Sequence, residues 1–455
     1  MLYWLLVFFH VISGLLILQN TGIKRLFYYY LGILYTPAVI SIIPQSMLMG
    51  HYFYVSMFII SMIRYKEFNM QNFMSCPLFN ALLIVFISYL LIGIFDFRHS
   101  AALSIYRSIQ YYCGTYFPFF IGWISLVDQN REYRPLGIIK GANGNCIEFL
   151  NFLLPFTLLM TLYGLMTAFT HSNPVLDAVG LKDRFLMESS VGFRSFRVTS
   201  TCVSSSVYGL ACATLTLVSL FLLKEKTKIQ IFAIGMLLLN VFLTATRAAI
   251  IPFLIGFIIL IILFNGIKGL FRNILLGVVV LLLLFPLLPG GIKEYMYEMM
   301  DSIVDVISPS GTGGMKYGGS NIDARTMQIT TAMEYLEKKP LFGHGFGYYG
   351  EVLSQGKKHV ELLGMESYLC FIGVERGLVN FIAECMFYIY VFCYFYRNRN
   401  VYCKEYSEAG LSLLCMFIPF LVFAWVGGCW FYFMPILGYL VKAIEITKER
   451  TNLTI

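Results

Sequence analysis

Charged residues are scarce in this sequence. Only 13% of the 455 residues are Asp, Glu, Lys or Arg, whereas about 25% are charged in ordinary soluble domains. Hydrophobic residues make up 58% of the chain and aromatic residues 17%. These proportions exclude an ordinary soluble protein and indicate a polytopic membrane protein. The formal net charge is +8, but the basic residues are scattered through short loops, so we expect no nucleic-acid partner.

Motifs for metals and nucleotides are also missing. The chain contains no Asp-x-Asp sequence, and its few aspartates are widely spread. It has no Gly-x-x-x-x-Gly-Lys-Ser/Thr sequence to cradle a nucleotide. Its 11 cysteines lie mostly in apolar runs, with neither a zinc spacing nor a paired framework. We therefore expect no metal and no cofactor.

The apolar runs predict about 13 membrane helices, within a range of about 12–14, because a helix needs about 20 apolar residues to cross the hydrocarbon. The first run, residues 2–19, has no basic leader and no small-residue cleavage site, so we expect a membrane helix rather than a cleaved signal peptide. The fold class is all-α, with residues 1–455 forming one integral membrane domain. The other spans are expected at residues 26–45, 48–63, 78–95, 103–126, 147–169, 207–223, 229–245, 247–264, 274–288, 367–396, 410–426 and 428–443.

Lysine and arginine predict the orientation, because basic residues in short loops stay on the cytoplasmic side. Alternating the spans places all the basic loops on one face, from Lys24 and Arg25 to the tail with Lys442. The N-terminus should therefore lie outside and the C-terminus in the cytoplasm. Two long loops, residues 170–206 and 289–366, then face outward, where there is room for a soluble chemistry.

The second outward loop contains three distinct stretches. Residues 292–306 place apolar side chains on one helical face with acids between them, which suits a helix on the bilayer surface. Asp323 to Glu337 has helical spacing and ends at Lys338-Lys339-Pro340. The sequence GHGFGYYG, residues 343–350, has glycines that permit either tight turns or the close approach of a ligand.

Two arginines lie at the edges of long apolar runs. Arg197 precedes a small polar run, and Arg247 lies between two apolar runs with no acid nearby in the sequence. An arginine at a membrane boundary usually has an anionic partner. The alternative for Arg197 is a helix-hairpin cap or a pair with Glu188.

Four features follow one another in the sequence. They are Arg197 followed by small polar residues and Gly209, Thr-Arg-Ala-Ala at 246–249, Pro340-Leu-Phe-Gly-His-Gly-Phe-Gly, and Glu366-Ser-Tyr-Leu followed by Glu375-Arg-Gly-Leu. In this order they resemble the O-antigen polymerase and ligase superfamily of bacterial envelope glycosyltransferases, and the resemblance covers roughly residues 190–390. Ligases of the superfamily show His-Asn before the Tyr-Leu pair, whereas Glu366-Ser367 stands here, which favours a polymerase.

The resemblance implies a GT-C-like membrane glycosyltransferase that polymerises undecaprenyl diphosphate-linked repeat units into O-antigen or capsular polysaccharide. It would act at the periplasmic face of the inner membrane, without a metal, and transfer the growing glycan to a hydroxyl of the next repeat unit. Expected partners are the lipid-linked donor and acceptor, membrane lipids and a chain-length regulator. The alternatives are a ligase that moves glycan to lipid A core and a flippase, although a transporter would place polar residues near the bilayer midplane.

The implied chemistry assigns roles to residues. Arg197 and Arg247, with Arg325 as a third candidate, would bind the diphosphate leaving group through planar, bidentate donors. Arg325 would otherwise pair with Asp323 or Glu334 on a solvated face.

A proton acceptor is needed for the incoming hydroxyl. Glu366 is the first choice, although it would also suit the water boundary of its helix. His359 and His344 are the second choices. Tyr348, Tyr349 and Tyr368 are placed where sugar rings could stack.

Two further groups of charged residues are expected to have either a structural or a binding role. Glu375 and Arg376 are expected to be structural support, satisfying each other or separate neighbours. Arg98, His99 and Arg107 lie near the outer end of a helix hairpin, where they would either bind glycan or lipid phosphate or anchor the hairpin at the interface.

Overall fold

The computed structural model describes residues 1–40, 50–126, 144–182, 197–223, 227–284, 293, 297, 322–354, 367–399, 403–423 and 429–453. Side chains are described in these ranges except at residues 144–148, 264, 265, 267, 269–284, 322–325, 353, 354, 423 and 450–453. All regular elements in these ranges are helical, and none is a strand. The protein is an all-α polytopic membrane protein, as the sequence predicts. Helices suit a bilayer because they satisfy every backbone polar group within one segment.

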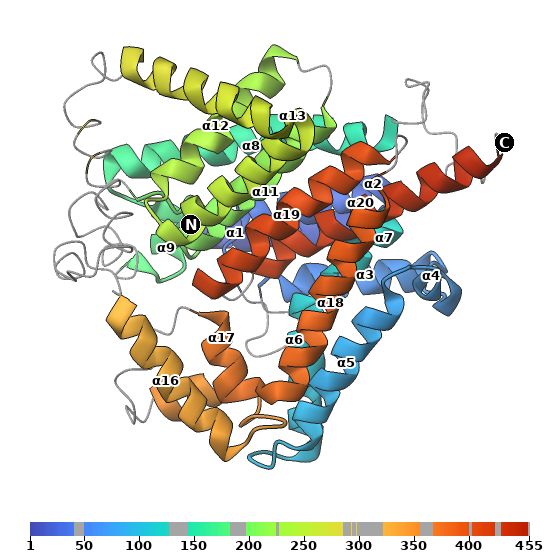
Figure 1. Cartoon of the computed structure of the whole chain (residues 1–455). Coiled ribbons are helices and arrows are strands. Elements are labelled where there is room, and N and C mark those ends of the chain that lie inside the picture. Colours follow the sequence, from blue (N-terminus) through green and yellow to red (C-terminus); the bar gives the residue numbers. More distant parts are fainter. Residues whose placement is uncertain are drawn as a thin grey trace.

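Figure 1 shows the helices coloured in their order along the chain. In chain order they are α1 (Leu2–Gln19), α2 (Gly22–Tyr35), α3 (Tyr52–Arg64), α4 (Met70–Met74), α5 (Phe79–Ile94), α6 (Ala101–Thr115), α7 (Pro118–Ser125), α8 (Gly144–Thr170), α9 (Pro174–Ala178), α11 (Ser205–Leu222), α12 (Lys228–Leu243), α13 (Arg247–Leu284), α16 (Ile322–Lys338), the π-helical turn η3 (Tyr349–Ser354), α17 (Tyr368–Phe371), the π-helical turn η5 (Ile372–Arg376), α18 (Gly377–Arg397), α19 (Lys404–Phe423) and α20 (Cys429–Leu453).

Five described segments are long and apolar enough to cross a membrane, and four shorter apolar helices accompany them. The five are Leu2–Gln19, Phe149–Thr170, Ser205–Leu222, Tyr368–Arg397 and Lys404–Val422. The shorter four are Tyr52–Arg64, Phe79–Ile94, Lys228–Leu243 and Arg247–Leu263. Each of them overlaps a span expected from the sequence. The expected total of about 13 spans stays a prediction.

Five expected spans differ from the structure. The helix expected over 26–45 ends at Tyr35, because Pro37 follows within two residues and disfavours helical geometry before it. The span expected over 103–126 is two helices, α6 and α7, with Pro118 at the first position of α7. The two spans expected from 247 to 288 form α13, interrupted at Gly266 with φ 68°. The span expected over 367–396 is interrupted at Gly377, with φ 72°.

Small residues allow the helices to approach closely. A Cβ added to Gly122 of α7 would lie 1.7 Å from the carbonyl oxygen of Pro435 in α20. A Cβ added to Gly438 of α20 would lie 1.9 Å from the carbonyl oxygen of Phe119 in α7. Two backbones therefore touch, which is how helices commonly pack in membranes, where lipid is as apolar as leucine.

Two basic residues predicted on the cytoplasmic face, Arg25 and Lys442, contact neighbouring parts of the structure. Arg25 forms an ion pair of 2.6 Å with Glu67 in the turn after α3. In α4, which follows this turn, the backbone carbonyl of Asn72 accepts a hydrogen bond from the Trp123 indole across 2.9 Å. Lys442 lies 4.5 Å above the Trp123 ring. The alternation of the spans stays a prediction. The direction of the protein across the membrane stays a prediction.

The other end carries the second outward loop. In Figure 1, α16 and α17 lie together at the lower end of the molecule, beside the ends of α5 and α6. The helix expected over Asp323 to Glu337 is confirmed as α16, which ends at Lys338 just before Pro340. The amphipathic helix expected over 292–306 lies almost wholly outside the described residues.

Candidate functional site

The glycine-rich loop 343–350 packs directly on the backbone at the break between α17 and α18. His344 N–H donates to the carbonyl of Val374 across 3.1 Å, and Gly345 N–H donates to the carbonyl of Glu375 across 2.9 Å. A Cβ added to Gly343 would lie 2.4 Å from the Glu375 carbonyl, and Gly343 has φ 63°. Glycine is therefore required at position 343, because the loop lies so close to the backbone at Glu375 that a side chain would not fit.

A second glycine of this loop meets the turn between α5 and α6. Gly345 has φ 93°, and a Cβ added there would lie 2.2 Å from Asp96 Oδ2. Arg98 donates to both Asp96 oxygens, at 2.9 and 2.8 Å, and to the carbonyl of Phe346 at 2.9 Å. The loop is thus held from two sides, by the helix break and by the helix hairpin.

Three basic side chains of this hairpin converge on one carboxylate. Arg107 lies 2.6 Å from Glu351 Oε1, while Arg98 and His99 lie 3.3 and 3.0 Å from Glu351 Oε2. We call Asp96, Arg98, His99, Arg107 and Glu351 the hairpin cluster. Hydrogen bonds from Arg107 and His99 outweigh the effect of partial burial and lower the pKa of Glu351. The cluster joins the hairpin to the glycine-rich loop, and the roles expected for Arg98, His99 and Arg107 at the membrane interface or toward a ligand stay predictions.

Glu375 and Arg376 are adjacent but face different neighbours. Glu375 is buried and accepts the backbone N–H groups of Gly347, at 3.2 Å, and Tyr349, at 2.8 Å. It therefore fixes the end of the glycine-rich loop and the start of η3. Arg376 is also buried and lies 3.0 Å from Glu384. Both residues support the loop and the helices around it.

His344 is held in one orientation on the glycine-rich loop. Its Nδ1–H donates to the carbonyl of Val374 across 3.0 Å, because a carbonyl can only accept. Its ring lies 4.6 Å from the Tyr348 ring and 5.4 Å from the Tyr335 ring. The bond at Nδ1 leaves Nε2 as the acceptor of the neutral ring, in the arrangement that a general base requires.

The surroundings of His344 favour its neutral form. Partial burial is the largest cause that lowers its pKa below the ordinary value, and the positive charges of Lys339, Arg98 and Lys338 act in the same direction. The hydrogen bond to Val374 opposes them without reversing the shift. His344 is therefore unprotonated at neutral pH.

The two arginines singled out from the sequence flank a single turn. Arg197 Nε donates to the carbonyl of Thr244 across 3.2 Å, and Val198 N–H donates to the carbonyl of Leu243 across 3.0 Å. Arg247 is the first residue of α13, just after this turn. The residues 244–247 form a turn that we call the arginine turn, with Arg197 alongside it.

Helix α11 packs tightly against the arginine turn. A Cβ added to Gly209 would lie 2.5 Å from the Cβ of Ala249 and 3.2 Å from a methyl of Thr244. The hydroxyls of Thr244 and Thr246 lie 3.0 Å apart. Gly209 therefore lets the first turn of α11 approach the first turn of α13, which fixes the position from which Arg247 projects.

The other predicted site residues are placed as follows. Glu366 and His359 lie outside the described residues, and Arg325 is in α16 without a described side chain. Tyr348 is half-buried between His344 and the Arg98 guanidinium, which lies 5.2 Å from its ring. Tyr349 packs 5.3 Å from the Phe371 ring.

Tyr368 is buried, and its hydroxyl donates to Glu384 across 2.8 Å. Its ring is covered by Trp430, 5.1 Å away. In this arrangement the Tyr368 ring is part of the protein interior, and its predicted role in stacking with sugars stays a prediction.

Sequence reasoning did not find Asp96, Glu351 or Glu384. All three act through partners distant in the sequence: Asp96 contacts Gly345, Glu351 contacts Arg107, and Glu384 contacts Tyr89 across 3.1 Å. A lone acid in an apolar run was the available signal for Glu384. In the part of the chain that the structure describes, no three His, Cys, Asp or Glu residues come together as a metal site.

The fold and the loop contacts thus define a polytopic helical membrane protein with a polar site at one end. A family model described as O-antigen ligase matches residues 232–383. The match supports a place in the O-antigen polymerase and ligase superfamily and a glycosyltransferase-like activity. It includes Arg247, the glycine-rich loop and His344, and begins after Arg197. No curated protein matches the chain.

Proposed function

We propose that this protein polymerises undecaprenyl diphosphate-linked oligosaccharide repeat units into O-antigen or capsular polysaccharide at the periplasmic face of the inner membrane. The acceptor hydroxyl oxygen forms a bond to the anomeric carbon of the donor glycan. The bond from that carbon to the diphosphate breaks, and polyprenyl diphosphate leaves with the bonding electrons. The hydroxyl proton passes to a base of the protein. A chain-length regulator and the two lipid-linked substrates are the proposed partners.

The pairing of Arg197 with the arginine turn is the observation that carries this proposal. A leaving diphosphate gains negative charge as its bond breaks, and guanidinium groups neutralise that charge while holding the oxygens in place. Removing one such donor from an active site costs about 3–4 kcal/mol of transition-state stabilisation. Hydrogen bonds from Arg197 and Val198 to Thr244 and Leu243 hold Arg197 beside the turn that ends at Arg247, and Arg325 remains the third candidate.

His344 is the base with the best supporting geometry among the described candidates. Its Nδ1 is anchored on Val374 at 3.0 Å, so Nε2 is oriented as acceptor, and its lowered pKa keeps it neutral. Such an anchored imidazole resembles the oriented bases of known hydrolytic sites. Glu366 and His359 stay candidates for the same role, and Tyr348 and Tyr349, next to His344, stay candidates for sugar contact.

The ligase is the second candidate, because the matching family model is described as O-antigen ligase. Both reactions release polyprenyl diphosphate, and they differ in the acceptor. The residues Glu366-Ser367 before Tyr368-Leu369 favour polymerisation, since they replace the His-Asn typical of ligases.

A strain lacking the gene distinguishes these reactions. We would run its surface glycan on a gel and analyse lipid-linked intermediates in parallel, with the wild-type gene and an Arg247→Ala variant as complements. Polymerase function predicts single repeat units on their carrier, no ladder, and rescue by the wild type alone. Bare core with long lipid-linked polymer would instead establish the ligase. Single units confined to the cytoplasmic leaflet would establish a flippase and overturn the proposal.

A further inference from the structure

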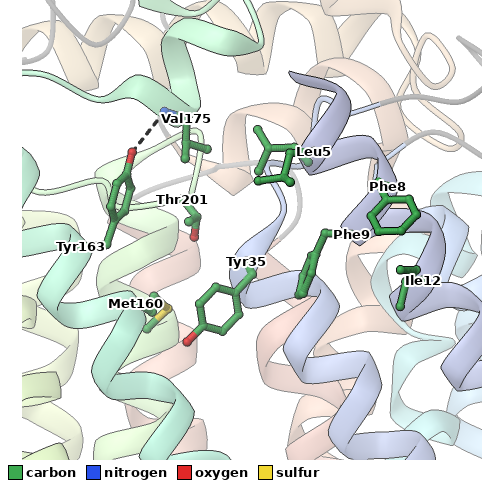
Figure 2. Close-up of a pocket in the computed structure, with 10 residues that line it drawn as sticks. Leu5, Phe8, Phe9, Ile12, Tyr35, Met160, Tyr163, Val175 and Thr201 are labelled. Carbon is green, nitrogen blue, oxygen red and sulfur yellow. Dashed lines mark hydrogen bonds between the residues drawn. The ribbon is translucent and has the colours of Figure 1, made fainter. Parts of the chain in front are cut away.

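A cavity of about 470 Å³ lies between α1, α2, α8 and α9. Figure 2 shows its lining, with Phe9 of α1 and Tyr35 of α2 on one side and Tyr163 of α8 and Thr201 on the other. Its volume falls within the range of about 300–1,000 Å³ that is usual for small-molecule sites. No charged residue is among those that line it.

Each hydroxyl in the wall already has a partner within the protein. Tyr35 donates to the carbonyl of Phe156, and Thr201 donates to the carbonyl of Leu34. Tyr163 donates to the Asn173 side chain at 2.8 Å and accepts the Val175 N–H at 3.1 Å, the bond drawn in Figure 2. A polar ligand would lose its water without gaining new hydrogen bonds here, which is costly. The cavity therefore suits an apolar chain.

The cavity is bordered by side chains that face lipid. Leu5 and Phe8 line it and are 62% and 64% exposed. They belong to α1, a helix long and apolar enough to span the membrane. An occupant can therefore enter sideways from the hydrocarbon, without crossing water. This route selects a molecule that already resides in the bilayer.

One short segment of the chain connects the cavity wall to Arg197, which lies alongside the arginine turn. Thr201 lines the cavity, and Arg197 lies four residues before it, so at most about 14 Å of chain separates them. Between them, Val198 packs on α8, since a Cβ added to Gly164 would lie 2.8 Å from Val198 Cγ1. Gly164 directly follows Tyr163 of the cavity wall. One side of the apolar wall and Arg197 thus lie on two elements that pack together, the end of α8 and the segment 197–201.

From these contacts we infer that the cavity binds the polyprenyl chain of the lipid-linked substrate, with its diphosphate at Arg197 and the arginine turn. The inference rests on the proposed function for the identity of the head group. It adds a tail site that orients the donor: α1 and α8 hold the isoprenoid chain, and the glycan extends beyond the arginines. A single lipid bound at both ends would enter the reaction with its diphosphate already placed.

Photocrosslinking of the full-length protein in detergent tests the tail site directly. We would place benzoylphenylalanine at Phe9, in the cavity wall, and at Leu15, an exposed residue of α1 outside it. The probe is radiolabelled undecaprenyl diphosphate without a glycan. We expect several-fold more adduct at position 9 than at position 15. Equal labelling at the two positions would overturn the inference.

Competition identifies the source of the bound chain. Unlabelled undecaprenyl phosphate should suppress the adduct at position 9, and the same concentration of phosphatidylglycerol should leave it largely intact. Equal suppression by phosphatidylglycerol would show a phospholipid site and overturn the assignment. Crosslinking needs no glycan transfer, so its failure in a strain with a normal ladder rejects the tail site alone. A failed ladder test with position-specific crosslinking rejects the polymerase and leaves the tail site in place.

A cavity-filling variant provides a functional readout. Ile12→Trp adds volume inside the cavity, whereas Leu15→Trp adds it on the lipid-facing side of the same helix. We expect Ile12→Trp to raise KM for the lipid-linked substrate by about tenfold, which corresponds to about 1.4 kcal/mol of lost binding. Leu15→Trp should leave KM unchanged. Equal KM values for the two variants would contradict the tail site.

Discussion

His344 Nδ1 and the carbonyl oxygen of Val374 lie 3.0 Å apart, and this bond joins the glycine-rich loop to the break before α18. A second hydrogen bond, from Gly345 N–H to the Glu375 carbonyl at 2.9 Å, joins the same two segments. Backbone hydrogen bonds between residues 344–345 and residues 374–375 thus fix the position of His344. The imidazole orientation depends on a membrane helix that is interrupted at Gly377, so the break in the helix and the candidate base are parts of one arrangement.

The first prediction concerns the pH dependence of polymer formation. His344 has a lowered pKa, and its protonated form cannot accept the hydroxyl proton. Activity in membrane preparations should therefore hold through the ordinary histidine pKa of about 6.5 and fall only at lower pH. His344→Gln should reduce the rate by about 100-fold or more, within the usual range for a general base, and remove this acidic limb.

A matched variant separates chemistry from folding. His99 is also half-buried in the hairpin cluster but is not proposed as a base, so His99→Gln should retain the acidic limb. A pH profile unchanged in His344→Gln would return the base to Glu366 or His359.

The second prediction concerns the arginine turn. Arg247→Ala and Arg197→Ala should each lower chain extension by about 100-fold or more, because each removes a donor to the leaving diphosphate. Arg247→Lys should recover only part of the activity, since an ammonium group cannot bind bidentately. The control is Arg64→Ala, which replaces the exposed last residue of α3 on the opposite predicted face. Long-chain glycan at normal levels in both arginine variants, with the protein in the membrane, would reject the diphosphate site.

The third prediction uses two glycines of the same loop. At Gly345, φ is 93° and a Cβ would meet Asp96 Oδ2 at 2.2 Å, whereas a Cβ at Gly350 meets nothing within 4 Å. An L residue in a left-handed conformation costs about 1–2 kcal/mol before any clash. Gly345→Ala should therefore lower the thermal unfolding temperature and the activity, and Gly350→Ala should preserve both. Similar behaviour of the two variants would show that the docking of this loop is not required.

Local patterns were sufficient for much of the fold. The helix from Asp323 to Glu337 was predicted because its spacing is periodic and Pro340 ends it, and both signals act within a few residues. The helix breaks at Pro118 and Gly377 were missed because a long apolar run indicates a membrane-spanning segment without showing whether that segment is one continuous helix. The Gly377 break depends on a distant partner, since Leu378 N–H donates to the Pro340 carbonyl at 2.8 Å.

The candidate site was predictable only by residue type. Arg197 and Arg247 were selected for charge at a membrane edge, and the structure adds that both flank one turn. The glycines at 343 and 345 were equally compatible with a turn and a ligand cradle, and their close contacts are with protein atoms. Glu351 gave no sequence signal because its partners, Arg98 and Arg107, are on a hairpin far away in the chain.

The fourth prediction tests orientation. Glu334 of α16 is exposed and lies in the loop predicted to face outward, whereas exposed Lys66 lies in a turn predicted to face the cytoplasm. In intact cells, an impermeant thiol reagent should label Glu334→Cys above the wild-type background and label Lys66→Cys only after permeabilisation. The reverse pattern would invert the topology and move the site to the cytoplasmic face.

The fifth prediction concerns the buried pair of Arg376 and Glu384. Their closest atoms lie 3.0 Å apart, and the Tyr368 and Tyr89 hydroxyls donate to the same carboxylate at 2.8 and 3.1 Å. Removing one buried charge leaves the other uncompensated and costs about 3–5 kcal/mol. Glu384→Gln should therefore unfold at a clearly lower temperature in detergent than the wild type.

The double variant decides whether that loss comes from the pair. Replacing both residues, as Arg376→Met with Glu384→Met, removes the uncompensated charge, and such exchanges are often neutral or stabilising. We expect the double variant to recover most of the stability that Glu384→Gln loses. Lys448→Ala, which removes a partly exposed ion pair with Glu445, should cost at most about 1 kcal/mol. If the double variant is as unstable as the single one, removing the uncompensated charge does not restore stability. The hydrogen bonds from the Tyr368 and Tyr89 hydroxyls, which glutamine can still accept and methionine cannot, would then hold α5, α17 and α18 together.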